Sequence, residues 1–247
     1  MIDDLVCLKE KFEKIRKHGW IASLREGTTG IGYTFETLIG KVEDDFPIPD
    51  FGTIEIKTRF QNAVRDITLI NATPDGDYLF PIKRIYEFFS YPDKTNPEYK
   101  VFYASMSVYP KYAGAKNRFK LHINRESKKI SILCIKPDGT IINPNISWSF
   151  ECLEEKIYRK LKYLCIVKAK AKYFGGVQHF LYYQISFYML RDFETFIKLM
   201  EDGIIKITFM IGVHRSGTKK GQMNNHGVAF DISEVDIEKL FTKICEY

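Results

Sequence analysis

Two carboxylates and a lysine lie close together in the stretch FPIPDFGTIEIKT, Phe46 to Thr58. The segment GTIEIKT, residues 52–58, alternates apolar and polar residues. This alternation predicts a strand that carries Glu55 and Lys57 on one face. Asp50 precedes the strand by a few residues, so the chain can turn its carboxylate back toward Glu55. Two converging carboxylates repel each other unless a cation lies between them.

The chemistry that this group predicts is metal-assisted hydrolysis of a phosphodiester. Ligation by oxygen alone favours a hard ion such as Mg²⁺, which retains several waters and accepts a phosphate oxygen. We therefore assign Asp50 and Glu55 as metal ligands. Lys57 would orient a water or neutralise charge on the phosphorus. The alternative interpretation is a solvated strand face, because so short a motif occurs by chance in many proteins.

The elements that must position these residues predict an α/β or α+β fold with a mixed sheet. Apolar residues at helical spacing predict helices at residues 3–18, 33–39, 150–162, 192–201 and 234–244. Strand patterns occur at residues 52–58, 65–71, 99–108, 117–124, 128–135, 163–170, 178–188, 204–211 and 227–232. A loop is expected at residues 212–226.

The composition is that of a globular chain. The 247 residues include 45% hydrophobic residues, which excludes a disordered chain. No apolar run approaches the ~18 residues that cross a bilayer, and the N-terminus is too charged for a signal peptide. The five cysteines show no CxxC spacing. The sequence therefore predicts a reduced, cytoplasmic protein with no membrane partner.

Charge is distributed unevenly along the chain, which has 37 Lys and Arg, 31 Asp and Glu, and a net charge of +6 with His neutral. Basic residues gather at 111–129, 156–173 and 214–226, whereas acidic residues cluster at Glu43, Asp44, Asp45 and Asp50. Basic stretches beside an acidic cluster indicate a polyanion partner that meets a metal centre. The alternative is that the lysines form solvated faces that keep the protein soluble.

Three blocks of sequence resemble the MvaI/BcnI family of type II restriction endonucleases. The first, Gly19 to Thr58, contains the runs GW and TGIGxTFE, an acidic stretch and PDFxxIEIKT. The second is SWSFECLEEKIYRKLKYLCIV, Ser147 to Val167, and the third is GIIKITFMIGVHRSGTKKGQMNNHGVAFDI, Gly203 to Ile232. Residues 75–145 show no such match. The resemblance implies the PD-(D/E)xK restriction-endonuclease-like fold, a mixed sheet flanked by helices, and kinship to MutH, the nicking enzyme of bacterial mismatch repair.

This resemblance implies a Mg²⁺-dependent, sequence-specific DNA endonuclease of the restriction type. It further implies a monomer that cuts double-stranded DNA one strand at a time at a short, pseudosymmetric CC/GG-type site, leaving 5′-phosphate and 3′-hydroxyl ends. One alternative is a MutH-like nicking enzyme that partner proteins recruit. Another is a DNA-binding module whose nuclease centre is inactive, although the intact Asp50, Glu55 and Lys57 argue against it.

The resemblance also assigns residues outside the catalytic strand. Glu36 matches an acidic residue near the family's active site, and its alternative is a surface helix glutamate. Lys160 is expected to contact a phosphate or to lie on the surface, although it can also correspond to a helix lysine near the MutH-type active site. We expect a single nuclease chain with two lobes, residues 1–145 for catalysis and residues 146–247 for DNA recognition.

The third block contains a loop of the form SGxxxGxxxxHG, Ser216 to Gly227, that the family uses to read DNA. Lys and Arg donate to guanine, Asn and Gln pair with adenine, and imidazole can donate or accept. The candidate DNA contacts are Arg215, Lys219, Lys220, Gln222, Asn224, Asn225 and His226. The alternative is an exposed, lysine-rich hairpin kept for solubility. Asn224, Asn225 and Asp231 depart from the pattern of a close relative, which leaves the target sequence open.

Overall fold

The computed structural model describes residues 2–41, 48–77, 80–114 and 116–247. The chain forms two compact units, each built from segments that are distant in sequence. Unit 1 contains Met1–Arg65, Ile157–Asp192 and Ile237–Tyr247, and unit 2 contains Asp66–Lys156 and Phe193–Asp236. The division expected near residue 145 falls inside unit 2, because the two units are interleaved along the chain.

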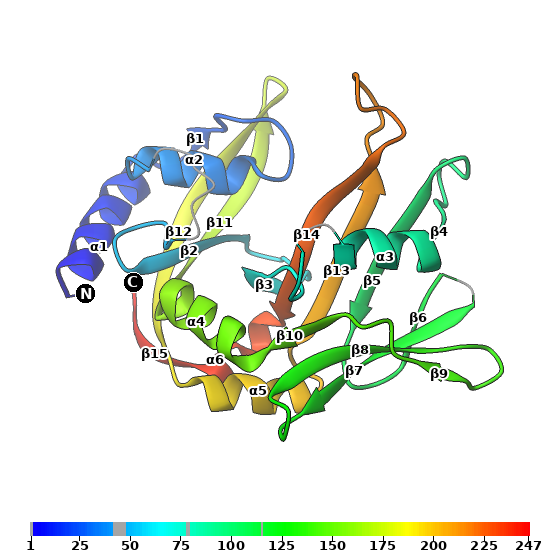
Figure 1. The fold of residues 1–247 in the computed structure, drawn as a ribbon. Helices are drawn as coiled ribbons and strands as arrows, with labels where there is room; N and C mark the ends of the chain where they lie inside the picture. Colours follow the sequence, from blue (N-terminus) through cyan, green and yellow to red (C-terminus); the bar gives the residue numbers. More distant parts are fainter. Residues whose placement is uncertain (1, 42–47, 78–79, 115) are drawn as a thin grey trace. The chain divides into compact units, whose positions relative to one another are not determined.

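Unit 1 is organised around a five-stranded mixed sheet with the order β1-β12-β11-β2, in which β15 also pairs with β12. The strands are β1 (Ile21–Ala22), β2 (Ile54–Phe60), β11 (Tyr163–Phe174), β12 (Val177–Leu190) and β15 (Phe241–Glu246). The β2–β11 pair is parallel, whereas the other pairs are antiparallel. Helix α1 (Ile2–Lys17) contacts β12, and helix α2 (Gly30–Leu38) contacts β2 (Figure 1).

The two helices and the sheet share one apolar core. Phe12 of α1 and Phe35 of α2 are fully buried in it, in accordance with the helical spacing of apolar residues in both segments. Ile54 and Ile56 of β2 enter the same core. The alternation along β2 therefore turns Glu55 away from this core, as the sequence predicted.

Unit 2 contains two five-stranded sheets. The first has the order β3-β14-β13-β5-β4 and contains β3 (Ile67–Asn71), β14 (Met223–Ile232), β13 (Lys206–Val213), β5 (Lys100–Met106) and β4 (Tyr91–Pro92). The second has the order β10-β8-β7-β6 with β9 paired to β8, and contains β6 (Lys111–Ala113), β7 (Asn117–Asn124), β8 (Lys129–Ile135), β9 (Ile141–Ile142) and β10 (Ser147–Ser149). Trp148 of β10 packs against Phe209 and Phe230 of the first sheet, and its Nε1 donates to the Ala72 carbonyl at 3.0 Å.

Four further helices lie in the described residues, of which α6 is given below. Helix α3 (Phe80–Phe89) and helix α5 (Phe193–Glu201) belong to unit 2, and α4 (Phe150–Leu161) crosses from the first segment of unit 2 into unit 1. In the described ranges, no helix is long and apolar enough to cross a membrane. The mixture of helices with a mixed sheet confirms the predicted α+β class.

Two predictions of secondary structure are wrong. The helix expected at 234–244 is a 3₁₀ turn (Glu234–Asp236), a short helix α6 (Ile237–Leu240) and the strand β15. Pairing with the edge of β12, including Leu190 opposite Phe241, outweighs the local helical pattern there. The loop expected at 212–226 is shorter, because β13 extends to Val213 and β14 begins at Met223. Helix α3 lies in a segment where no element was predicted.

Candidate active site and nucleic-acid interface

Glu55 is almost completely buried, with a side chain that is 1% exposed. Its Oε1 accepts a hydrogen bond from Lys57 Nζ at 2.7 Å and lies 3.3 Å from Lys160 Nζ. Its Oε2 is buried and has no hydrogen-bond partner among the described residues. Burial raises the pKa of Glu55, and the charge of Asp50 raises it further, while Lys57 and Lys160 act in the opposite direction. The carboxylate is therefore held by two cations on one oxygen and left unsatisfied on the other.

Asp50 turns back onto the catalytic strand. Its Oδ2 accepts a hydrogen bond from the backbone N–H of Ile56 at 2.9 Å, which places the carboxylate beside Glu55. Lys41 Nζ lies 3.9 Å from Asp50 Oδ1, with 11% of its side chain exposed. The sequence did not reveal Lys41, since it follows the end of α2 and shares no spacing pattern with the motif. The acidic residues Glu43, Asp44 and Asp45 lie outside the described residues.

Glu36 reaches this group from α2. A Cβ atom at Gly32 would lie 3.2 Å from Thr58 Oγ1 and 3.5 Å from Glu36 Oε1, so glycine permits the close approach of α2 to β2. Burial raises the pKa of Glu36, and the charge of Asp50 raises it further. These influences place Glu36 in the same electrostatic cluster instead of on a separate surface.

Lys160 also belongs to this cluster. Helix α4 leads directly into β11, and the parallel pairing sets Leu164 opposite Glu55. The helix end that carries Lys160 is thereby delivered to the carboxylate. Of the interpretations considered from the sequence, the geometry favours a helix lysine at the active site over a lysine on open surface.

The two carboxylates suit a divalent cation. Within the part of the chain that the structure describes, no group of three or more His, Cys, Asp or Glu side chains is arranged to hold a metal ion. Two carboxylates such as Asp50 and Glu55 would suit an ion that retains water and accepts a substrate oxygen. Glu55 Oε2 is a buried oxygen that needs a partner, and a cation would supply one.

The candidate recognition residues lie on the hairpin of β13 and β14, coloured orange to red in Figure 1. The turn between the strands is closed by hydrogen bonds from His214 N to Gln222 O at 2.9 Å and from Gly221 N to His214 O at 2.8 Å. Of the candidate residues on this hairpin, Arg215, Lys219, Lys220, Gln222 and His226 are exposed. Asn224 and Asn225 are half-buried and lie on β14, not in the loop that the sequence predicted.

Side chains at the start of β14 are held by local contacts. Asn224 Nδ2 lies 3.1 Å from His226 Nε2, and Asn225 Oδ1 accepts the Gly227 N–H at 3.1 Å. A Cβ atom at Gly212, opposite Asn224, would lie 2.6 Å from the Tyr103 hydroxyl, so glycine allows that ring to lie across β13. Tyr103 is 44% exposed and was not identified from the sequence. The structure thus brings Asn224 and His226 together and places the Tyr103 hydroxyl beside Gly212, the residue paired with Asn224.

Arg215 is paired with a residue from the segment that matched no known block. Its Nη2 lies 3.0 Å from Asp93 Oδ2. Asp231, where a basic residue was expected, is buried and accepts the Thr68 hydroxyl at 2.7 Å. The departure at Asp231 therefore has a role in joining β3 and β14.

Comparison with known proteins identifies the family. The model of the MvaI/BcnI restriction endonuclease family matches residues 9–241. The chain belongs to this family. A solved structure described as a restriction endonuclease MvaI–cognate DNA substrate complex matches with a TM-score of 0.90 and 27% identity, covering 99% of this chain and 98% of that chain. The structure of MvaI in the absence of DNA matches with a TM-score of 0.61, 26% identity and the same coverage. A search of curated proteins gives no match.

The family and the structural match make this chain a type II restriction endonuclease, a site-specific deoxyribonuclease, and confirm the predicted restriction-endonuclease-like fold. Endonucleases of this kind generally use divalent metal ions. The motif TGIGxTFE that carried the resemblance has a physical explanation here. Ile31 and Phe35 enter the core, the Thr34 hydroxyl accepts the Leu24 N–H at 3.0 Å, and Gly32 admits Glu36 to the cluster.

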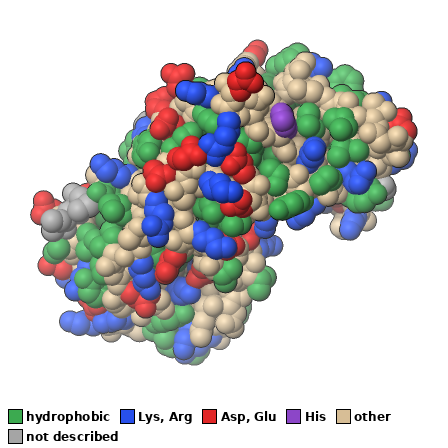
Figure 2. Space-filling view, turned by 90° about the horizontal axis from the view of Figure 1, so that it is seen from below, with side chains coloured by type: hydrophobic (Ala, Val, Ile, Leu, Met, Phe, Trp, Pro, Cys, Tyr) green, Lys and Arg blue, Asp and Glu red, His purple; other side chains and the backbone are tan. Residues whose placement is uncertain are grey.

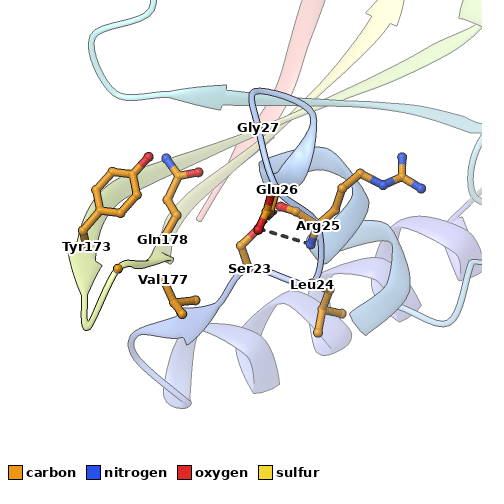
Figure 3. A pocket seen from close by; sticks show the side chains of 9 residues that line it. Ser23, Leu24, Arg25, Glu26, Gly27, Tyr173, Val177 and Gln178 are labelled. Carbon is orange, nitrogen blue, oxygen red and sulfur yellow. Dashed lines mark hydrogen bonds between the residues drawn. The ribbon is translucent and has the colours of Figure 1, made fainter. Parts of the chain in front are cut away.

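Unit 1 of this endonuclease contains a cavity of about 480 Å³. Its walls are the loop at residues 23–27 and the end of the β11–β12 hairpin, where Tyr173 and Gln178 face the loop (Figure 3). Ser23 Oγ in the loop donates to the Arg25 carbonyl at 2.6 Å. None of the predicted catalytic side chains lines this cavity.

The basic stretches of the endonuclease are only partly available to a partner. In the view of Figure 2, Lys and Arg side chains lie interspersed with acidic ones. Lys156 donates to the Asn71 carbonyl at 3.0 Å, and the Lys172 ammonium lies 3.9 Å from the centre of the Trp20 ring. Arg125 binds Glu194 and Glu201, each at 2.6 Å. Several lysines and arginines that the sequence grouped together therefore serve the fold.

Proposed function

We propose that this chain is a Mg²⁺-dependent restriction endonuclease that hydrolyses phosphodiester bonds of double-stranded DNA at a short, pseudosymmetric CC/GG-type site. The observation that carries the proposal is the Glu55 carboxylate, which is buried, paired with two lysines through Oε1 and unsatisfied at Oε2. An ion pair that only stabilises the fold does not explain a buried oxygen without a partner, whereas a bound cation would provide that oxygen with one. The target type is the one that the resemblance to this family implies, and family membership supports it.

Each side chain of the cluster has a proposed role. Asp50 and Glu55 hold the cation, which when bound stabilises negative charge on the phosphate and supplies an acidified water. Lys57 is placed beside Glu55 Oε1 to orient the attacking water or to neutralise charge on the phosphorus. Lys160, which lies on α4, is placed beside the same oxygen, Glu55 Oε1. Glu36, whose pKa is raised by burial, is a better proton acceptor than an ordinary glutamate.

The proposed DNA contacts lie on the β13–β14 hairpin. Exposed donors and acceptors on a strand pair suit the major groove, where bases present distinct patterns. The residues are Arg215, Lys219, Lys220, Gln222, Asn224, Asn225 and His226. That a structure of MvaI contains its cognate DNA substrate supports the DNA partner. We further propose that the enzyme acts as a monomer in the cytoplasm, with catalysis and recognition in different units.

Digestion of plasmid DNA tests the proposal. With Mg²⁺ the wild type should convert plasmid to linear fragments whose mapped ends share one short sequence, and without Mg²⁺ the plasmid should stay intact. Lys57→Ala should not cut, while Lys162→Ala, which alters an exposed lysine of the basic stretch 156–173, should cut normally. Nicked circles as the final product would favour the MutH-like alternative. Binding without any cutting would favour an inactive DNA-binding module.

A further inference from the structure

We infer that Asp93 is a positioning residue for sequence recognition, which holds the Arg215 guanidinium in place to contact a base edge. The inference rests on the proposed function, because it requires that the β13–β14 hairpin reads DNA. It gives a role to a residue of the segment 75–145, which matched none of the recognised sequence blocks.

Hydrogen bonds from its own turn fix the Asp93 carboxylate independently of Arg215. Asp93 begins the turn after β4, and its backbone N–H donates to the Tyr99 carbonyl at 2.9 Å. Its Oδ1 accepts the backbone N–H groups of Thr95 at 2.8 Å and Asn96 at 2.9 Å. These amides, that of Asn96 first, hold the pKa of Asp93 below its usual value, so the carboxylate is ionised at neutral pH. The side chain is 12% exposed.

The turn that carries Asp93 is joined to the recognition hairpin through one sheet. Pro92 of β4 pairs with Lys100 of β5, and Phe102 of β5 pairs with Ile211 of β13. The Tyr91 hydroxyl also donates to the Tyr103 carbonyl at 2.8 Å, which ties β4 to β5 by a side chain. Asp93 is thus held on hydrogen-bonded strands and not on a free arm.

The Arg215 guanidinium can bind Asp93 through some of its donors and contact a base through others. Its guanidinium has five N–H donors in a fixed plane, and the contact with Asp93 Oδ2 is made through Nη2 at 3.0 Å. The side chain is 48% exposed, so a base edge can approach it. A long side chain loses rotamer freedom when it binds, and a partner that fixes it beforehand reduces that cost. Guanine, with two acceptors in the major groove, is the base that an oriented guanidinium fits.

Charge repulsion and a positioning role predict opposite effects of neutralising Asp93 on affinity for cognate DNA, so an experiment can distinguish them. An acidic side chain near bound DNA repels the phosphates, so its neutralisation strengthens binding to any sequence. If Asp93 positions Arg215, the same neutralisation must weaken binding to the cognate sequence relative to all others. A mere surface ion pair predicts no change in that ratio.

The experiment uses the full chain with Asp93→Asn, which retains an oxygen to accept the Thr95 and Asn96 amides. Affinity is measured without divalent cation, at one salt concentration, for the duplex identified by plasmid digestion and for a scrambled duplex. We expect the cognate-to-scrambled ratio to fall about tenfold, within the range for one base contact, with scrambled affinity unchanged or higher. Asp138→Asn is the matched control, since Asp138 Oδ1 accepts the Thr140 N–H at 2.9 Å in a similar turn.

A double variant tests whether Asp93 acts through Arg215. In an Arg215→Ala background, Asp93→Asn should change the ratio no further. An unchanged ratio in Asp93→Asn, an equal loss in the Arg215→Ala background, or binding that strengthens by the same factor for both duplexes would each overturn the inference. A lower melting temperature for Asp93→Asn than for Asp138→Asn, together with equal losses on both duplexes, would overturn it in favour of a structural role. A wild type that prefers no sequence would instead reject the proposed function itself.

Discussion

Replacement of Glu55 by glutamine separates two roles for this carboxylate, as a metal ligand or as the anchor of an ion-pair cluster. Loss of one partner from a buried ion pair costs about 3–5 kcal/mol, because a buried charge is left uncompensated. Here the partners are 26% exposed for Lys57 and 28% for Lys160, so water can reach both ammonium groups. Glutamine also removes a negative charge whose burial is unfavourable, and this offsets part of the lost ion-pair energy.

We therefore expect the metal-free Glu55→Gln protein to lie within about 1 kcal/mol of the wild type. For a chain of this size, 1 kcal/mol corresponds to roughly 2–4 °C in melting temperature. Cation binding stabilises the folded state by about 2.7 kcal/mol at a concentration of about 100 Kd, which predicts a rise of roughly 5–11 °C for the wild type. The variant should show only a small part of that rise.

Thermal unfolding with chelator and across a Mg²⁺ titration measures both quantities. Glu154→Gln, on the exposed side of α4, is a control for the loss of one acidic charge. A fall of more than about 6 °C in the metal-free variant would make Glu55 a structural anchor. A full Mg²⁺-dependent rise in the variant would remove Glu55 from the metal site.

Three further predictions address the same residues and the hairpin. Lys57→Ala should lower the cleavage rate by ~10²–10⁴ while metal-free DNA affinity, measured by filter binding, stays unchanged; near-normal cutting would reject its catalytic role. Burial raises the pKa of both Glu36 and Glu55 above 4.5, so the folded state takes up protons that the unfolded chain does not. The contribution of these two groups to metal-free stability should therefore rise as pH falls from neutral, so the melting temperature of the wild type should rise relative to that of a Glu36→Gln, Glu55→Gln double variant over that range. His226→Ala should cost about 1–3 kcal/mol on cognate DNA and little on scrambled DNA in a binding titration, and equal losses on both would indicate that His226 only packs the turn.

Local sequence patterns predicted which residues of the candidate site lie on one strand face. Alternation placed Glu55 and Lys57 on the same side of β2, and burial of Ile54 and Ile56 confirms that orientation. The contact of Lys160 with Glu55 could not be predicted from such patterns. It depends on the parallel pairing of β2 with β11, whose paired residues are about 110 positions apart in sequence.

Elements that depend on distant partners were the ones that sequence patterns missed. The segment at 241–246 carries a helical pattern, yet it forms β15 because β12 offers a strand edge. The pair of Arg215 with Asp93 joins residues 122 positions apart. Asn224 and Asn225 were assigned to a loop because Gly221 and Gly227 flank them, whereas pairing with β13 extends the strand through both residues.

Because β2 pairs with a strand that lies much later in the chain, the order of synthesis determines when the site can form. Within the described part of the chain, β11 is the one strand that pairs with β2. A ribosome releases β2 long before it synthesises α4 and β11, so the carboxylates of a nascent chain have neither their covering strand nor Lys160. Translation products that stop before Tyr163 contain Asp50, Glu55 and Lys57 but cannot assemble the site around them.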